Sequence, residues 1–288
     1  MSRAERLSME RNGMRMGRSL LLGTAALLTW ASMLVQVGTV RAQTPTFDLA
    51  RDWSLTGAHF KGMPFGPEYA WSVCAVQFKP DGSWQTFDRA MHFTISNPWL
   101  DLYGIDGWWL GSSPVLRKPM AGKNVGQGNI PGEVHGVNYD WPIGRVAAFS
   151  RPNSDQSKGE PTMTAVVWTA PRAMEVSVTG GVWMAGQYQE AAEHRSRVMM
   201  WISRASNAGG TADEIIFRDV LVPLWTDGYD SDHPEAFAQI LGNHASQLEK
   251  IKVAKGDRIA VGFYWDGAAS KPGLNGIDVR VVEGLGTK

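Results

Sequence analysis

Short apolar segments, separated by glycine or proline at intervals of about ten residues, recur along the sequence after residue 42. The chain contains 32 glycines and 15 prolines, which are scattered rather than gathered into linkers. Helical spacing of apolar residues is clearest in 234–251, where Gly242 and Asn243 interrupt it, so we expect a short helix there. The pattern predicts an all-β fold: a single antiparallel β-sandwich with long insertion loops.

Two regions show strand periodicity most clearly. Residues 71–91 contain two β-rich runs joined by KPDG, whose proline and glycine favour a tight turn, so a hairpin is expected. In the C-terminal third, alternating apolar residues predict strands around 251–253, 258–264 and 277–282. We expect these three strands to be neighbours, with a tight turn at 255–257. The side chains expected to face the core are Ile259, Val261 and Phe263.

The first 42 residues have the pattern of a signal peptide. Five arginines precede a long apolar run, and Val40-Arg41-Ala42 places small or medium residues where a signal peptidase cleaves. A membrane anchor is the alternative, because the run is long enough to span, but no cluster of basic residues follows it. We expect 1–42 to be removed and 43–288 to form one domain, periplasmic or extracellular, without stable membrane insertion.

The charge of the mature part argues against a nucleic-acid partner. The chain has 28 basic and 28 acidic residues, and six arginines but only two glutamates lie in the leader, so the remainder is slightly acidic. Binding to phosphate needs a concentrated positive surface, and no such cluster follows residue 42. Cys74 is the only cysteine, which excludes an intramolecular disulfide. Within WSVCAVQF it is expected to be a small buried residue.

Several short motifs carry a resemblance to a known group of domains. WTAPRAMEVSVTGGVW, KVAKGDRIAVGFY, NGIDVRVV and FDLARDWSLTG resemble the core strands of secreted bacterial β-jelly-roll domains of the galactose-binding-like or carbohydrate-binding-module-like type. The resemblance implies a jelly roll, a common form of β-sandwich. In that group these motifs form turns and core strands, so the resemblance implies no catalytic activity.

Established catalytic and nucleotide-binding motifs are missing from the sequence: it has no HExxH, GxSxG, GxxxxGK, CxxC or EF-hand loop. The best catalytic candidate is His135, beside Glu133 and Tyr139. A His/Tyr pair could act as base and acid in a polysaccharide lyase, and a carboxylate pair could act in glycoside hydrolysis. The favoured alternative is a polar histidine in a loop, in a protein that is not an enzyme.

One acidic loop could bind a metal ion. The segment TDGYDSDHPE carries Asp227, Asp230 and Asp232, and Ca²⁺ prefers several oxygen ligands from a flexible loop. Structural calcium is therefore the only cofactor considered, and a solvated turn is the favoured alternative. Asp48 and Asp278 form a second, weaker pair, on terminal strands that should lie together.

The tryptophans divide into two groups. Trp108 and Trp109 are adjacent, between Gly107 and Gly111. Adjacent residues of a strand point to opposite faces, so one of the two indoles needs a second apolar surface, a covering loop or a ligand. Other tryptophans lie in strand-like runs and are expected in the core: Trp53, Trp71, Trp168 and Trp201.

Three functional hypotheses follow. In the first, the protein binds a polysaccharide or surface glycan through exposed aromatics, on a platform of Trp108, Trp109 and Trp141 with Asn138 and Asp140 as hydrogen-bonding groups. In the second, it is a structural or interaction protein of the envelope without a small ligand. In the third, it is a lyase or hydrolase of the same fold. An exposed strip formed by Trp108, Trp109, Trp141 or Trp225 would favour the first.

Overall fold

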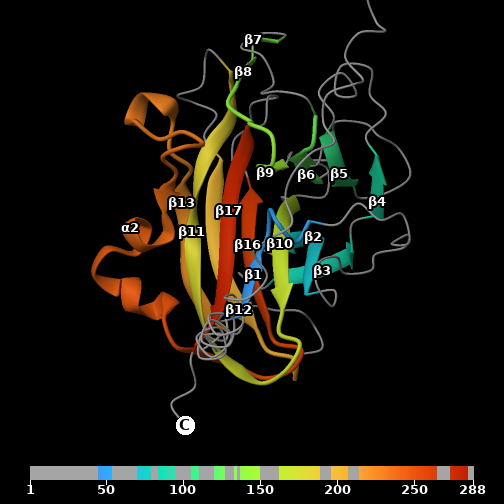
Figure 1. Ribbon diagram of the computed structural model, residues 1–288, viewed down its shortest axis with the longest axis vertical. Coiled ribbons are helices and arrows are strands. Elements are labelled where there is room, and N and C mark those ends of the chain that lie inside the picture. Colours follow the sequence, from blue (N-terminus) through green and yellow to red (C-terminus); the bar gives the residue numbers. More distant parts are fainter. Residues whose placement is uncertain are drawn as a thin grey trace, which may run out of the picture. The chain divides into compact units, whose positions relative to one another are not determined.

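Figure 1 shows a computed structural model of the chain. The structure describes residues 45–53, 70–78, 84–89, 91–94, 105–109, 120–126, 133–134, 137–149, 162–188, 196–206, 214–264 and 273–284. These residues form mainly strands, which lie in two antiparallel sheets packed against each other around an apolar core. The predicted all-β sandwich is therefore confirmed. The predicted leader lies outside the described residues.

The larger sheet has eleven described strands, in the order β4-β5-β6-β9-β17-β11-β8-β7, with β1 paired to β17 and both β14 and β15 paired to β11. In Figure 1, β1, β11 and β17 run side by side. The strands of this large sheet are β1 (Thr46–Asp48), β4 (Met91–Thr94), β5 (Ile105–Trp109), β6 (Met120–Asn124), β7 (Glu133–Val134), β8 (Val137–Tyr139), β9 (Val146–Phe149), β11 (Met174–Tyr188), β14 (Glu235–Ala236), β15 (Ile251–Val253) and β17 (Leu274–Glu283).

The smaller sheet has six described strands, in the order β13-β12-β16-β10-β2-β3. Strands β2 and β3 pair antiparallel, which confirms the hairpin predicted for 71–91, although its turn lies outside the described residues. The strands of this small sheet are β2 (Trp71–Phe78), β3 (Trp84–Arg89), β10 (Thr162–Thr169), β12 (Arg197–Ser203), β13 (Glu214–Leu221) and β16 (Arg258–Tyr264).

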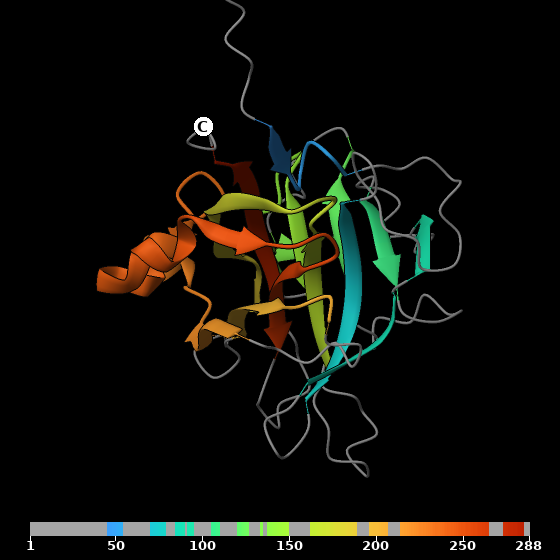
Figure 2. The same ribbon diagram turned by 90° about the horizontal axis from the view of Figure 1, so that it is seen from below.

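Among the described residues, the helical segments are short, as expected for 234–251. A 3-10 turn, η4 (Trp225–Asp227), precedes α2 (Phe237–Leu241), and a second 3-10 segment, η5 (Gly242–Leu248), follows α2. Gly242 ends α2 with a φ of 53°, a left-handed value that glycine adopts without steric cost. The α2–η5 segment lies at one edge of the sandwich, beside β11 (Figure 2). Within the described residues, no helix is long and apolar enough to cross a membrane.

The core between the sheets confirms the predicted facing of β16. Ile259, Val261 and Phe263 are at most 3% exposed and belong to one apolar cluster with residues of both sheets. The tryptophans predicted to be core residues, and Cys74, are all buried as well. Period-two alternation in β16 places every second side chain in this cluster, so the sequence pattern itself determines the inner face.

The pairing of the C-terminal strands was predicted wrongly. β15 ends at Val253 and β16 begins at Arg258, as expected, but β15 pairs with β11 in the large sheet and β16 belongs to the small sheet. Residues 254–257 therefore form a tight turn, as predicted, closed by a hydrogen bond from the Asp257 N–H to the Ala254 carbonyl (3.1 Å). This turn crosses between the sheets instead of joining two paired strands. β17 pairs with β1, β9 and β11, so none of the three strands is paired with another of the three. The alternation of apolar and polar residues indicates which face of a strand is buried, but it does not indicate which strand is its neighbour.

Asp257 fixes this crossing. Its side chain is 4% exposed, and its carboxylate accepts hydrogen bonds from the backbone N–H groups of Ala205 (2.8 Å) and Ala254 (2.9 Å) and from Arg204 Nη1 (2.9 Å). Burial by itself raises the pKa of Asp257, but the two backbone hydrogen bonds and the Arg204 guanidinium outweigh it and hold the pKa below its ordinary value. The ionised carboxylate therefore stabilises the folded state.

Replacing Asp257 with asparagine is expected to cost about 1.5–3 kcal/mol at neutral pH, because hydrogen bonds to a buried charge are lost. Since the pKa of Asp257 is lowered on folding, its contribution is complete above the unfolded value of about 3.9 and is lost as the pH falls through the folded value. Urea unfolding between pH 7 and pH 2 should therefore show a smaller acid-induced loss of stability in Asp257→Asn than in the parent. Parallel pH profiles would contradict this.

Candidate functional site on the outer face of the large sheet

The outer face of the large sheet carries a second apolar layer next to Trp183. Trp183 on β11 stands opposite Gly276 on β17, and a Cβ atom at position 276 would lie 1.9 Å from the indole. The indole therefore occupies the space that a side chain at 276 would fill. Trp183 and Ala147 are fully buried although they lie outside the core cluster between the sheets. The sandwich thus buries aromatic surface on its outer side too.

The turn at 140–145 is held against this layer by main-chain acceptors. Trp183 Nε1 donates to the carbonyl of Asp140 (3.0 Å), and Trp141 Nε1 donates to the carbonyl of Arg145 (2.9 Å). Asn124 Nδ2 donates to the carbonyl of Trp141 (2.6 Å). The Arg145 guanidinium carbon lies 6.0 Å from the centre of the Trp183 ring, within the range of a cation–π contact. The turn is therefore rigidly placed.

Two residues predicted to bind a ligand hold this turn instead. Trp141 is 1% exposed, so the prediction that it belongs to an exposed platform is wrong: its indole is packed inside and its N–H is used by its own turn. The Asp140 carboxylate accepts hydrogen bonds from the backbone N–H (2.5 Å) and the hydroxyl (2.6 Å) of Ser231. Asp140 thereby ties the turn to the loop after η4.

The other candidates on β7 and β8 are only partly described. Tyr139 is half-buried, and its ring lies against Gly186, where an added Cβ would be 3.2 Å away. The backbones of Glu133 and Asn138 are paired with each other in the β7–β8 ladder. His135 lies outside the described residues. The catalytic hypothesis for His135, Tyr139 and Glu133 therefore stays a prediction.

Trp108 and Trp109 lie in β5, so this segment is extended. Position 108 is in register with Ala121 of β6, and Ala121 belongs to the core between the sheets. Adjacent positions belong to opposite faces, so the backbone places 108 on the inner face and 109 on the outer face. Trp225, a further platform candidate, is half-buried and donates its indole N–H to the carbonyl of Met184.

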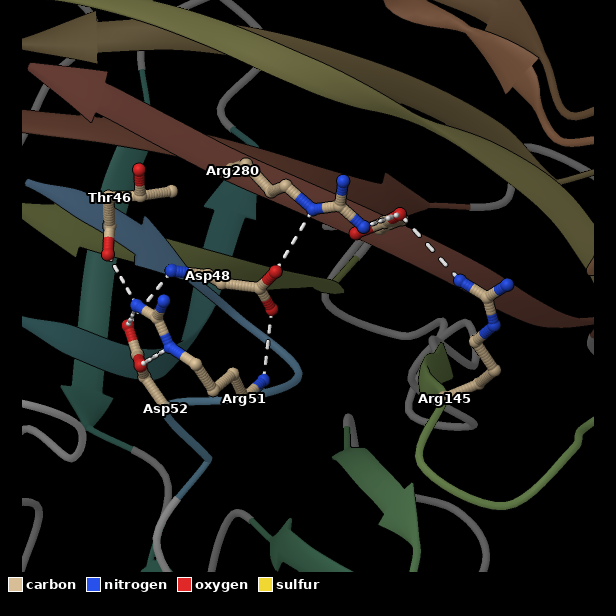
Figure 3. A network of polar contacts seen from close by, with 7 residues as sticks. Thr46, Asp48, Arg51, Asp52, Arg145 and Arg280 are labelled. Atoms are coloured by element: carbon tan, nitrogen blue, oxygen red, sulfur yellow. Dashed lines mark hydrogen bonds and ion pairs between the residues drawn. The ribbon is translucent and has the colours of Figure 1, made fainter. Parts of the chain in front are cut away.

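A row of charged side chains crosses the outer face (Figure 3). Arg280 Nε contacts Asp48 Oδ2 (2.9 Å), and Arg280 Nη2 contacts Asp278 Oδ2 (3.2 Å). Arg145 Nη1 lies 3.7 Å from the same Asp278 oxygen. We call these four residues the Arg–Asp ladder. Arg280 is 50% exposed and Arg145 is 32% exposed, so the guanidinium groups face solvent.

Strand register explains the ladder. β1 runs antiparallel to β17 and brings Asp48 opposite Arg280, so the two terminal strands lie together, as predicted, and both aspartates contact Arg280. The group between them is a guanidinium, however, and it takes the place that a cation would need. Along β17, Asp278 and Arg280 alternate with residues of the core, which directs both outward. Arg51 braces the end of β1 through its contacts with the Asp52 carboxylate and the Thr46 carbonyl.

The acidic loop after η4 forms a turn. Asp230 Oδ1 accepts hydrogen bonds from the backbone N–H groups of Asp232 (2.9 Å) and His233 (2.7 Å), and Asp227 Oδ2 accepts one from Leu224 (3.0 Å). Slight burial raises the pKa of Asp230, and hydrogen bonds from His233 and Asp232 outweigh it and lower the pKa. Across the described part of the chain, no group of three or more His, Cys, Asp or Glu side chains is arranged to hold a metal ion. These hydrogen bonds show that the loop forms local turns, and calcium binding by Asp227, Asp230 and Asp232 stays a prediction.

Sequence reasoning missed Arg145 and Arg280. Arg280 follows Asp278 at the spacing of one strand face, so alternation in the last strand was a usable signal. Arg145 comes from a turn, and nothing in the local pattern predicts its position. Comparison of the sequence with protein-family models and with curated proteins finds no match. The resemblance to jelly-roll domains stays a prediction, and the function has to be argued from the site itself.

Proposed function

We propose that the protein is an exported, non-catalytic β-sandwich that binds a polysaccharide or surface glycan on the outer face of its large sheet. The observation that supports this proposal is the Arg–Asp ladder, in which two guanidinium groups face solvent beside two partly exposed carboxylates. Its members lie on the adjacent strands β1 and β17 and in the turn before β9. Because each member is held by its neighbour, little side-chain entropy is lost when a ligand binds.

The chemistry of the ladder suits a neutral, hydroxyl-rich ligand. Two guanidinium groups and two carboxylates offer donors and acceptors without net charge. A sugar hydroxyl both donates and accepts, so it can bind between such groups without breaking their ion pairs. Arg280 contacts the two aspartates through Nε and Nη2, and a guanidinium has more N–H donors than these contacts use. An anionic ligand would compete with the aspartates.

In this proposal, Trp109 adds an aromatic contact to the ligand. Position 109 pairs with Met120 on β6, and Met120 pairs with Phe149 on β9. Phe149 pairs with Leu274 on β17. This row crosses the same outer face as the ladder. Stacking of an indole on the flat face of a sugar ring would then add to the hydrogen bonds of the ladder.

Replacing Arg280 with alanine is expected to weaken binding to a neutral polysaccharide at least about tenfold, because charge-assisted hydrogen bonds are lost. Affinity electrophoresis in gels containing β-glucan, xylan or galactomannan measures the effect. Arg218→Ala is the matched control, since Arg218 is also exposed and paired with an aspartate but lies on β13 of the small sheet. Equal retention of Arg280→Ala and Arg218→Ala would exclude the ladder as the binding site.

A second function, an envelope interaction protein without a small ligand, is favoured by a separate observation. Val125 (43% exposed) and Ile143 (51% exposed) lie on two neighbouring turns, which are joined by the hydrogen bond from Gly144 N–H to the Asn124 carbonyl (2.7 Å). A protein partner could bury these two aliphatic side chains together, because the hydrogen bond holds their turns next to each other. Absence of binding by the parent protein to every polysaccharide tested would favour this second function.

A further inference from the structure

Two polar groups are buried without a partner at one end of the space between the sheets. Asn275 and Ser196 are both fully buried. Within the part of the chain that the structure describes, Asn275 Oδ1 and Ser196 Oγ have no hydrogen-bond partner. Leaving such a group unsatisfied costs about 1–3 kcal/mol, so an explanation is needed for each.

Both groups border Gly273. Asn275 Nδ2 donates to the carbonyls of Ala148 (3.2 Å) and Gly273 (3.4 Å). Ser196 Oγ lies 3.1 Å, and Met184 Sδ 3.0 Å, from the point that a Cβ atom on Gly273 would occupy. Met184 on β11 and Asn275 on β17 are also opposite each other where these two strands pair. Gly273 therefore lies close to both the serine hydroxyl and the asparagine amide, with no side chain of its own between them.

The contacts of the amide fix its orientation. Nδ2 faces two carbonyl oxygens, which can only accept, so the atom left over is the oxygen, an acceptor that lacks a donor. The serine hydroxyl can donate and accept. One additional hydroxyl group would satisfy both, by donating to Asn275 Oδ1 and accepting from Ser196 Oγ. A charged group does not fit, because Ala148 and Met184 make this part of the interior apolar.

We infer that a neutral hydroxyl group binds between Asn275 and Ser196, supplied either by an ordered water or by a small polyol. The site lies on the inner side of the large sheet, whereas the Arg–Asp ladder lies on its outer face, so this inference does not depend on the proposed function. A hydroxyl bound here joins β17 to the residue that precedes β12, and thereby links the two sheets.

The sign of one stability change tests the inference. If the hydroxyl is bound, Ser196→Ala removes one of its partners, and the melting temperature of the full-length protein should fall by about 2–5 °C. If the site is empty, the same substitution removes an unsatisfied buried group, and the melting temperature should rise or stay unchanged. Thr164→Val is the control, because the buried Thr164 hydroxyl donates to the Phe149 carbonyl (2.6 Å) and its loss should lower the melting temperature in either case.

Crystals grown without polyol and then soaked in glycerol identify the source of the hydroxyl. A water within hydrogen-bond distance of both atoms in each crystal supports an ordered water, and a glycerol hydroxyl in its place supports a polyol site. A direct bond from Ser196 Oγ to Asn275 Oδ1, or no density between them, overturns the inference. Polysaccharide retention of Ser196→Ala should equal that of the parent, so this result and that for Arg280 can fail independently.

Discussion

Replacing Gly276 with alanine is expected to destabilise the protein by about 1–3 kcal/mol or more, because the new methyl group has no space. A Cβ atom there would lie 1.9 Å from the Trp183 indole, and Trp183 is fully buried, with its N–H bonded to the Asp140 carbonyl. To relieve the clash, the indole would have to move and the 140–145 turn would lose its anchor. Guanidinium unfolding with tryptophan fluorescence measures the loss.

Two further variants separate this clash from other effects of alanine. Gly284→Ala is the control, since a Cβ there would lie 3.4 Å from the nearest atom, an ordinary contact. In a Trp183→Leu background the clash with the indole is absent, so Gly276→Ala should cost less than in the parent. Strictly additive costs of the two substitutions would show that the indole does not occupy the space above Gly276.

Ile259→Ala is expected to reduce the free energy of unfolding by about 2–5 kcal/mol, the usual range for a cavity in a packed core. Ile259 is 3% exposed, and it lies in the central strand β16 of the small sheet, where β10 and β12 flank it. Ile215→Ala on the edge strand β13 removes the same atoms from a side chain that is 41% exposed, and it should cost far less. Similar midpoints for the two variants in urea would contradict the inner-face assignment.

The sequence predicted strands and buried faces well. It also predicted the β2–β3 hairpin and the pairing of the terminal strands, but it was wrong about the partners of β15 and β16. Alternation identifies the buried face of β16 because burial of every second side chain follows from the geometry of one strand. The partner of β15 depends on β11, which lies far away in the sequence, so the alternation in 251–253 contains no information about it. The turn at 254–257 looks the same locally whether it joins paired strands or crosses between sheets.

In the candidate site, too, some predictions were right and others were wrong. Asp48 and Asp278 were expected together because the terminal strands of a sandwich commonly pair, and β1 does pair with β17. Trp141 was placed on a binding platform because a tryptophan beside asparagine and aspartate in a loop resembles a sugar-binding residue. The same residues also suit a turn in which the Trp141 N–H and the Asp140 carboxylate form hydrogen bonds within the protein. Only the three-dimensional contacts distinguish a binding platform from such a turn.

The position of β17 bears on when the chain can fold during its synthesis. β17 is the last described strand, yet it lies inside the large sheet and joins β1, β9 and β11. A nascent chain that stops short of residue 274 lacks the strand that unites these segments. Contacts between distant parts of a sequence slow folding, so the large sheet should be completed only after β17 has been synthesised.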